Sequence, residues 1–175
     1  MTEYVAFLRG VNVGGITLKM ADVKQTFADA GFTDVRTILA SGNVVFTSER
    51  TDRAKLKKDI ESALRKAFGY DAWIVLLDVE TVGKIIADFP FEAERDGWHN
   101  YVLLSSDDGA LTDLLKFADD LDPMMEQIEG GDGVLYWAVE RGYTLTSKFG
   151  KETAKKKYKS ATTNRNLRTL QKIVR

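Results

Sequence analysis

The chain has no cysteine, only two prolines and one histidine among its 175 residues. Without cysteine it can form no disulfide, thiolate metal ligand or cysteine nucleophile. With His99 as the only histidine, we identify neither a metal-ligand cluster nor a Ser–His pair. Apolar runs stay well below the roughly 18 residues of a membrane span, and the charged start MTEYVAFLRG is atypical of a signal peptide. We therefore expect a cytoplasmic protein, monomeric by default, with no membrane partner, metal or cofactor.

Charge is distributed unevenly along the chain, although the formal net charge is only -1. From Arg141 to the end there are 11 basic residues and one acid, so this basic C-terminal region carries +10. The preceding residues hold 14 basic and 25 acidic side chains, or -11. Two interpretations remain open: the basic C-terminal region docks on the acidic body, or it binds an anionic partner.

The first half of the chain alternates strand and helix patterns. The expected elements are a strand at 3–9, a helix at 20–30, strands at 35–40 and 43–47, a helix that follows an N-cap at Asp52 and ends at Gly69, and a strand at 72–77. The order βαββαβ is that of the ferredoxin-like plan. We assign residues 1–78 to a first unit of this kind.

The second half repeats the pattern with less distinct elements. Residues 79–97 form a connecting helix and turn, 98–163 a second ferredoxin-like unit, and 164–175 a basic C-terminal helix. Within the second unit we expect strands at 100–105, 125–129 and 134–139, helices at 111–117 and 146–158, and a short strand near Ala161. The predicted fold class is α+β, with two α/β plaits whose sheets are antiparallel. Because several strands are apolar without interruption, we also expect the two halves to pack together.

Four segments carry a resemblance to a known family. They are FLRGVNVGG at 7–15, KMADVK at 19–24, GFTDVRTILASGNVVF at 31–46 and RNLRTL at 165–170. The chain resembles the bacterial domain of unknown function 1697 family (DUF1697). The resemblance implies a pair of ferredoxin-like units and no established activity.

The glycine-rich turn between the first strand and the first helix is the leading candidate site. Its glycines are spaced as in a P-loop, but the lysine of that motif is missing. Ile16 occupies the lysine position, and Thr17 occupies the position of the serine or threonine. A general anion site, with Arg9 or Lys19 as the cation, is the functional interpretation, and a plain structural turn is the alternative. Asn43, in the Ser41–Asn43 hairpin, is a second candidate, with a tight hairpin as its alternative.

The basic C-terminal region is the other candidate site. The spacing of Lys148, Lys151, Lys155 and Lys159 predicts a basic stripe on one helix face, and Arg165 begins a second stripe. Both stripes can follow a phosphate backbone, whereas the alternative is a solvated surface. For His99 we expect packing or hydrogen bonding rather than base catalysis. The acids at 92–96 are typical of a solvated turn.

We predict an uncharacterised bacterial protein whose main property is anion binding, with a phosphorylated metabolite or a nucleic acid as its partner. The alternatives are an enzyme acting on a phosphorylated or carboxylated small molecule, with no catalytic residue assigned, and a protein-interaction scaffold. The predicted ligand-binding residues are Arg9, Asn12, Gly14, Gly15, Lys19, Asn43, Lys148, Arg165 and Asn166.

Overall fold

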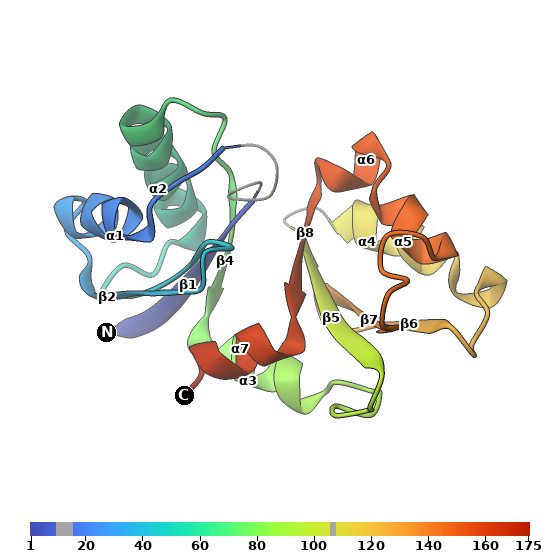
Figure 1. Cartoon of the computed structure of the whole chain (residues 1–175). Helices are drawn as coiled ribbons and strands as arrows, with labels where there is room; N and C mark the ends of the chain where they lie inside the picture. Colours follow the sequence, from blue (N-terminus) through green and yellow to red (C-terminus); the bar gives the residue numbers. More distant parts are fainter. Residues whose placement is uncertain (10–15, 106–107) are drawn as a thin grey trace. The chain divides into compact units, whose positions relative to one another are not determined.

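The chain divides into two compact units in the computed structural model, which describes residues 1–9, 16–105 and 108–175 (Figure 1). Unit 1 comprises Met1–Val82 and Lys172–Arg175, and unit 2 comprises Gly83–Gln171. The predicted glycine-rich turn at 10–15 lies outside the described residues. The expectation that the two halves pack together stays a prediction.

Unit 1 contains one four-stranded antiparallel sheet with the strand order β2-β3-β1-β4. Its elements in chain order are β1 (Thr2–Leu8), α1 (Met20–Asp29), β2 (Thr33–Ile38), β3 (Asn43–Ser48), α2 (Arg53–Phe68) and β4 (Ile74–Asp78). The βαββαβ plan predicted for the first half is thus confirmed.

The core of unit 1 lies between the sheet and its two helices (Figure 1). Apolar side chains at helical spacing on α1 and α2 supply one side, and alternate residues of β1 and β3 supply the other. Phe27, Phe32 and Phe46 meet at its centre, with ring centroids 4.7 to 6.1 Å apart. This aromatic cluster joins α1 to the sheet.

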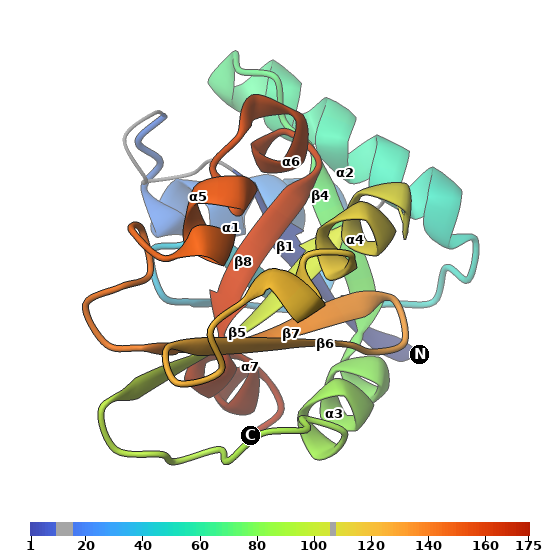
Figure 2. The ribbon, with the colours of Figure 1, turned by 90° about the vertical axis from the view of Figure 1, so that its right-hand side faces the viewer.

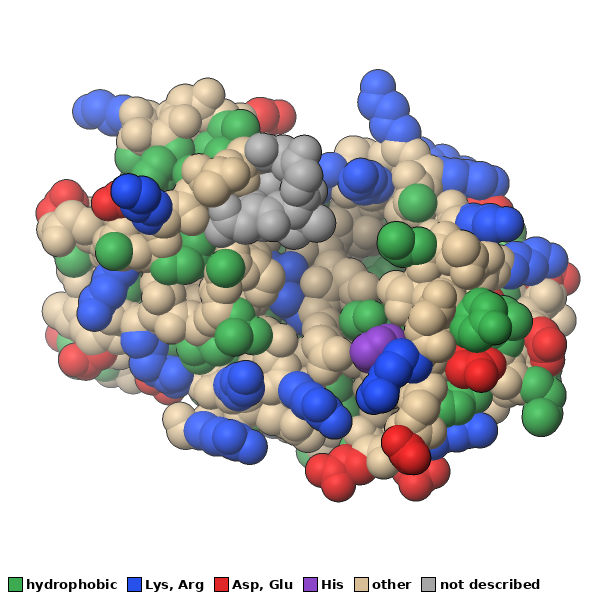
Figure 3. All heavy atoms as spheres, in the orientation of Figure 1, with side chains coloured by type: hydrophobic (Ala, Val, Ile, Leu, Met, Phe, Trp, Pro, Cys, Tyr) green, Lys and Arg blue, Asp and Glu red, His purple; other side chains and the backbone are tan. Residues whose placement is uncertain are grey.

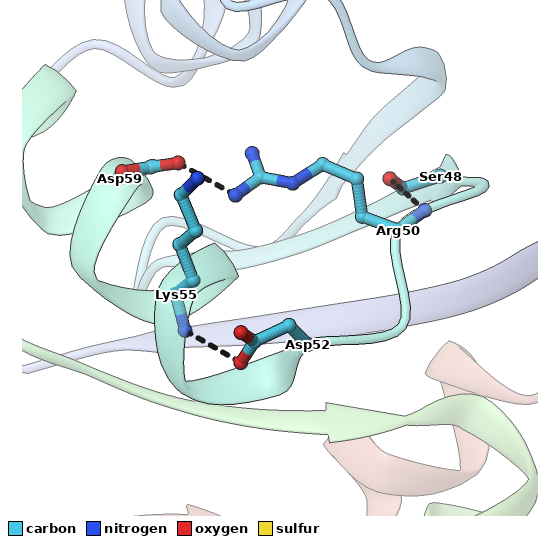
Figure 4. A network of polar contacts seen from close by, with 5 residues as sticks. All are labelled: Ser48, Arg50, Asp52, Lys55 and Asp59. Carbon is cyan, nitrogen blue, oxygen red and sulfur yellow. Dashed lines mark hydrogen bonds and ion pairs between the residues drawn. The ribbon is translucent and has the colours of Figure 1, made fainter.

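The start and end of α2 follow local rules that were read from the sequence. Asp52 is the N-cap, and its Oδ1 accepts a hydrogen bond from the Lys55 N–H at 3.1 Å (Figure 4). Just before it, Arg50 donates from its guanidinium to Asp59 at 2.6 Å. Gly69 ends the helix with φ 66°, a left-handed conformation that glycine adopts without strain.

Unit 2 repeats this topology with the strand order β6-β7-β5-β8. The connecting helix α3 (Val79–Ala87) crosses the boundary between the units. The elements that follow are β5 (Trp98–Ser105), α4 (Asp108–Leu115), a 3-10 helix η1 (Ala118–Asp120), β6 (Glu126–Gly130), β7 (Val134–Glu140), α5 (Lys148–Thr153), α6 (Lys156–Lys159), β8 (Thr162–Asn166) and α7 (Leu167–Ile173). The second plait and the C-terminal helix are therefore confirmed.

The core of unit 2 lies between this sheet and α4, α5 and α6, which cover one face of it (Figure 2). It contains a buried carboxylate, because Glu126 is only 2 % exposed. Glu126 accepts hydrogen bonds from Trp137 Nε1 at 3.1 Å and from the Phe149 N–H at 3.2 Å, which ties β6 to β7 and α5. On the other face, Tyr136 donates its hydroxyl to the Ile85 carbonyl at 2.8 Å.

The single helix predicted for 146–158 is wrong, because the structure has two short helices, α5 and α6, in its place. Lys155 interrupts the helical pattern with an extended backbone (φ -63°, ψ 140°) and becomes the N-cap residue of α6. The interruption places Tyr158 in the core of unit 2. The predicted lysine stripe therefore does not lie on one continuous helix face.

Candidate functional site

The residues that flank the predicted glycine-rich turn are placed by the structure, whereas Asn12, Gly14 and Gly15 lie outside the described residues. Arg9 is half-buried, and its guanidinium lies over the Trp73 ring at 5.3 Å from the centroid. Lys19 is exposed at the N-cap position of α1. Anion binding at this turn stays a prediction.

Asn43 is fully buried where β3 begins. Its Nδ2 donates to the Ile38 carbonyl at 2.7 Å and to Ser41 Oγ at 2.9 Å. Leu39 and Gly42 both have positive φ, so the turn is tight and the side chain of Asn43 bridges it. This geometry gives Asn43 a structural role in the hairpin, and a role in ligand binding stays a prediction.

The three predicted residues of the basic C-terminal region have different surroundings. Lys148 is exposed at the start of α5. Arg165 is buried, and its Nη1 donates to Thr163 Oγ1 at 2.6 Å and to the Asn164 carbonyl at 3.1 Å. Burial lowers the pKa of Arg165 to about 10, which leaves the guanidinium charged at neutral pH. Asn166 ends β8, and of the three it alone lines the cavity described next.

A cavity of about 220 Å³ in unit 2 opens where β8 stops short of its neighbour. β5 pairs with β7 from Trp98 to Leu104, but β8 pairs only with the part of β5 from Tyr101 to Ser105. The start of β5 thus has no strand partner on the β8 side within the described residues. Residues 93–96 and the start of α7 border the resulting gap.

Two arginines bring positive charge to the cavity from separate elements. Arg141 directly follows β7, and its N–H donates to the Gly97 carbonyl at 2.8 Å. Arg168 is in the first turn of α7, where its N–H donates to Asn166 Oδ1 at 2.9 Å. Both side chains are exposed and both line the cavity. Backbone hydrogen bonds therefore hold the main chain of each arginine, whereas its guanidinium is exposed at the cavity.

His99 lies near both arginines, and basic side chains border the purple histidine in Figure 3. Burial lowers the pKa of His99, and the positive charges of Arg141 and Arg168 lower it further. The imidazole is therefore neutral at neutral pH, with one nitrogen as a donor and the other as an acceptor.

Asn100 lines the same cavity, and its residue is only 8 % exposed. Its Nδ2 donates to the carbonyls of Glu92 and Ala93 at 3.1 and 2.8 Å. An inverted amide would place an oxygen against these two carbonyls, so the orientation is determined by its partners. Oδ1 is buried and finds no hydrogen-bond partner within the described part of the chain. An unpaired buried acceptor costs about 1 to 3 kcal/mol.

Acidic side chains line the cavity as well, because Glu94 and Asp96 are exposed on the bordering segment. Between them, Arg95 lies over the Trp98 ring at 3.8 Å from the centroid. Among the described residues, no ion pair joins Glu94 or Asp96 to Arg141 or Arg168. Charges of both signs thus line one cavity without neutralising each other directly.

Sequence reasoning identified Asn166, and the basic C-terminal region that contains Arg141 and Arg168, but it did not place His99, Asn100, Glu94 or Asp96 in a site. The signal that it passed over is the run ERDGWHN at 94–100, which combines charged, aromatic and amide side chains at the start of a strand.

Metal-binding clusters and membrane-spanning helices are both absent from the described residues. No group of three or more histidine, aspartate or glutamate side chains is arranged there to hold a metal ion. The helices that the structure describes are all too short or too polar to span a lipid bilayer.

Comparisons with known proteins identify the family. A search of curated proteins finds no match. Among solved structures, the conserved bacterial protein SP0830 from Streptococcus pneumoniae is similar, with a TM-score of 0.82 and 23% sequence identity over 99% of this chain and 97% of that one. At this identity the similarity supports the fold alone. A family model described as protein of unknown function (DUF1697) matches residues 1–136. The chain thus belongs to the DUF1697 family of uncharacterised proteins.

Proposed function

We propose that the protein binds a small molecule through a carboxylate or phosphate group in the cavity of unit 2. The observation that carries this proposal is that Arg141 and Arg168 line one cavity beside a neutral His99. Neither arginine forms an ion pair with an acid in the described part of the chain. The positive charge that these two guanidinium groups bring to one cavity is complementary to an anionic group of a ligand.

The chemistry of these side chains suits an oxyanion. A guanidinium presents a planar set of donors that matches carboxylate and phosphate oxygens in a bidentate contact. The neutral imidazole of His99 adds one donor without adding charge. Arg141 follows β7 and Arg168 lies two residues beyond β8, and these two strands lie on opposite sides of β5. Each arginine can thus contact a different oxygen of the same group.

The size of the cavity favours a metabolite over a nucleic acid. Sites for drug-sized ligands measure about 300 to 1,000 Å³, and this cavity is smaller, at about 220 Å³. The basic C-terminal region also has no continuous helix face over the predicted lysine stripe that could follow a phosphate backbone, since α5 and α6 are separate. A small carboxylate or phosphate compound is therefore the leading class of ligand.

The proposal is tested by calorimetric titration of the full chain with inorganic phosphate, succinate and L-alanine. A charge-assisted hydrogen bond contributes about 1.5 to 3 kcal/mol, so Arg141→Ala or Arg168→Ala should weaken binding by about tenfold or more. Lys151→Ala is the matched control, because it removes an exposed positive charge of unit 2 outside the cavity. Binding that survives both arginine changes would place the site elsewhere.

A separate measurement addresses the nucleic-acid interpretation. Fluorescence anisotropy with a short single-stranded RNA at two salt concentrations should show no tight, salt-sensitive binding if the cavity is the main anion site. Binding near micromolar that falls steeply with salt would instead favour contacts to a phosphate backbone.

A further inference from the structure

We propose that the ligand of this cavity is a free α-amino acid, held by its carboxylate and its ammonium group together. This inference rests on the proposed function and names its class of ligand. Arg141 and Arg168 take the carboxylate, whereas Glu94, Asp96 and Asn100 take the ammonium.

The first observation is the charge of the cavity lining. A purely anionic ligand would be attracted by Arg141 and Arg168 but repelled by Glu94 and Asp96, which line the same cavity. Like-charge contacts of this kind disfavour a ligand that lacks a complementary positive group. A zwitterion pairs with both kinds of side chain at once. The lining therefore selects for a carboxylate that is accompanied by a cation.

The second observation is the unpaired oxygen of Asn100. Oδ1 needs a donor, and an ammonium group has three N–H donors and no acceptor. One of them can satisfy Oδ1, which leaves two for Glu94 and Asp96. In the structure Oδ1 is covered by its neighbours, so contact with a ligand requires the surrounding residues to move.

The third observation is the volume. An apolar cavity of about 150 Å³ holds one benzene molecule, so about 220 Å³ accommodates an amino acid of roughly six to nine non-hydrogen atoms. Alanine, serine and aspartate fall in this range. A nucleotide does not fit within it.

The test begins with a thermal-shift screen of the common L-amino acids on the full chain, because a ligand that binds the native state raises the melting temperature. The best of them is then titrated beside two analogues, one N-acetylated and one without the amino group. We expect the amino acid to bind at least tenfold more tightly than either analogue. Equal binding of all three would overturn the zwitterion and leave the anion site standing, whereas failure of every carboxylate and phosphate to bind would overturn the proposed function itself.

Two variants separate the roles of the acids. Glu94→Gln combined with Asp96→Asn should remove the preference for the free amino group and should preserve or strengthen binding of the deaminated analogue. Glu92→Gln is the matched control, because this acid is exposed in the same segment and its side chain does not line the cavity. An unchanged preference in the double variant would contradict the assignment of Glu94 and Asp96.

Discussion

Two helical glycines provide a paired prediction in which the same chemical change has opposite effects. Gly83 lies in α3 and Gly150 in α5. A Cβ added at Gly83 would meet nothing within 4 Å. A Cβ added at Gly150 would overlap the Thr144 carbonyl oxygen and lie 3.0 Å from Ser147 Oγ. Alanine should therefore be tolerated at position 83 and rejected at position 150.

The magnitudes follow from helix propensity and packing. Alanine is favoured over glycine inside a helix by about 1 kcal/mol, so Gly83→Ala should raise the free energy of unfolding by about that amount. At Gly150 the same gain is opposed by overpacking of about 1 to 3 kcal/mol and by disturbance of the hydrogen bond from the Gly150 N–H to Ser147 Oγ. That bond contributes about 1 kcal/mol. Gly150→Ala should thus destabilise the protein by roughly 1 to 3 kcal/mol.

Urea unfolding followed by circular dichroism measures both changes, and thermal unfolding gives an independent value. A change of 1 kcal/mol shifts the melting temperature by about 2 to 4 °C in a chain of this size. Gly83→Ala is the control for a general effect of alanine. If Gly150→Ala were as stable as the wild type, the close approach of α5 to Thr144 would not exist in solution, and the reasoning would be refuted.

Three further predictions concern caps, buried acceptors and titration. Asp52→Ala should cost about 1 kcal/mol in thermal unfolding, because α2 loses its N-cap acceptor, whereas Asp52→Asn retains one. Glu126→Gln should cost about 1 to 3 kcal/mol in urea unfolding, since an amide NH₂ would face one of the two buried donors; unchanged stability would mean that the carboxylate is not their acceptor. By NMR titration the pKa of His99 should lie below 6.5. Because the folded state disfavours its protonation, stability should fall as the pH is lowered from 6.5 through the folded-state pKa, and His99→Gln should flatten this dependence. A His99 that titrates at or above 6.5 would contradict its position beside the two arginines.

The fold of this protein follows from patterns that are local in the sequence. Apolar periodicity identified both βαββαβ units, and Asp52 and Gly69 marked the ends of α2 because caps depend on one or two residues. The helix expected at 146–158 shows the limit of such patterns. Its interruption at Lys155 accompanies the burial of Tyr158, and burial depends on residues distant in the sequence.

The candidate cavity is harder to predict because it results from a mismatch in strand length. β8 pairs with only part of β5, so residues from 93–100, Arg141 and the start of α7 meet at the uncovered end. Strand pairing of this kind is not visible in the periodicity of either strand. The acids at 94 and 96, which match a solvated turn by composition, could not be assigned to a cavity without that register.

The position of β8 has a consequence for the order in which the chain folds during translation. The strands of unit 1 are all synthesised by Asp78, whereas β5, which pairs with β7 on one side, receives its partner on the other side only when Thr162–Asn166 emerge. Domains generally fold from the N-terminus during translation. A nascent chain arrested before residue 162 would therefore carry all the strands of the first plait and a β5 edge with unpaired backbone groups, which is a template for association with other chains. Premature termination late in the message should consequently yield aggregates rather than a usable fragment.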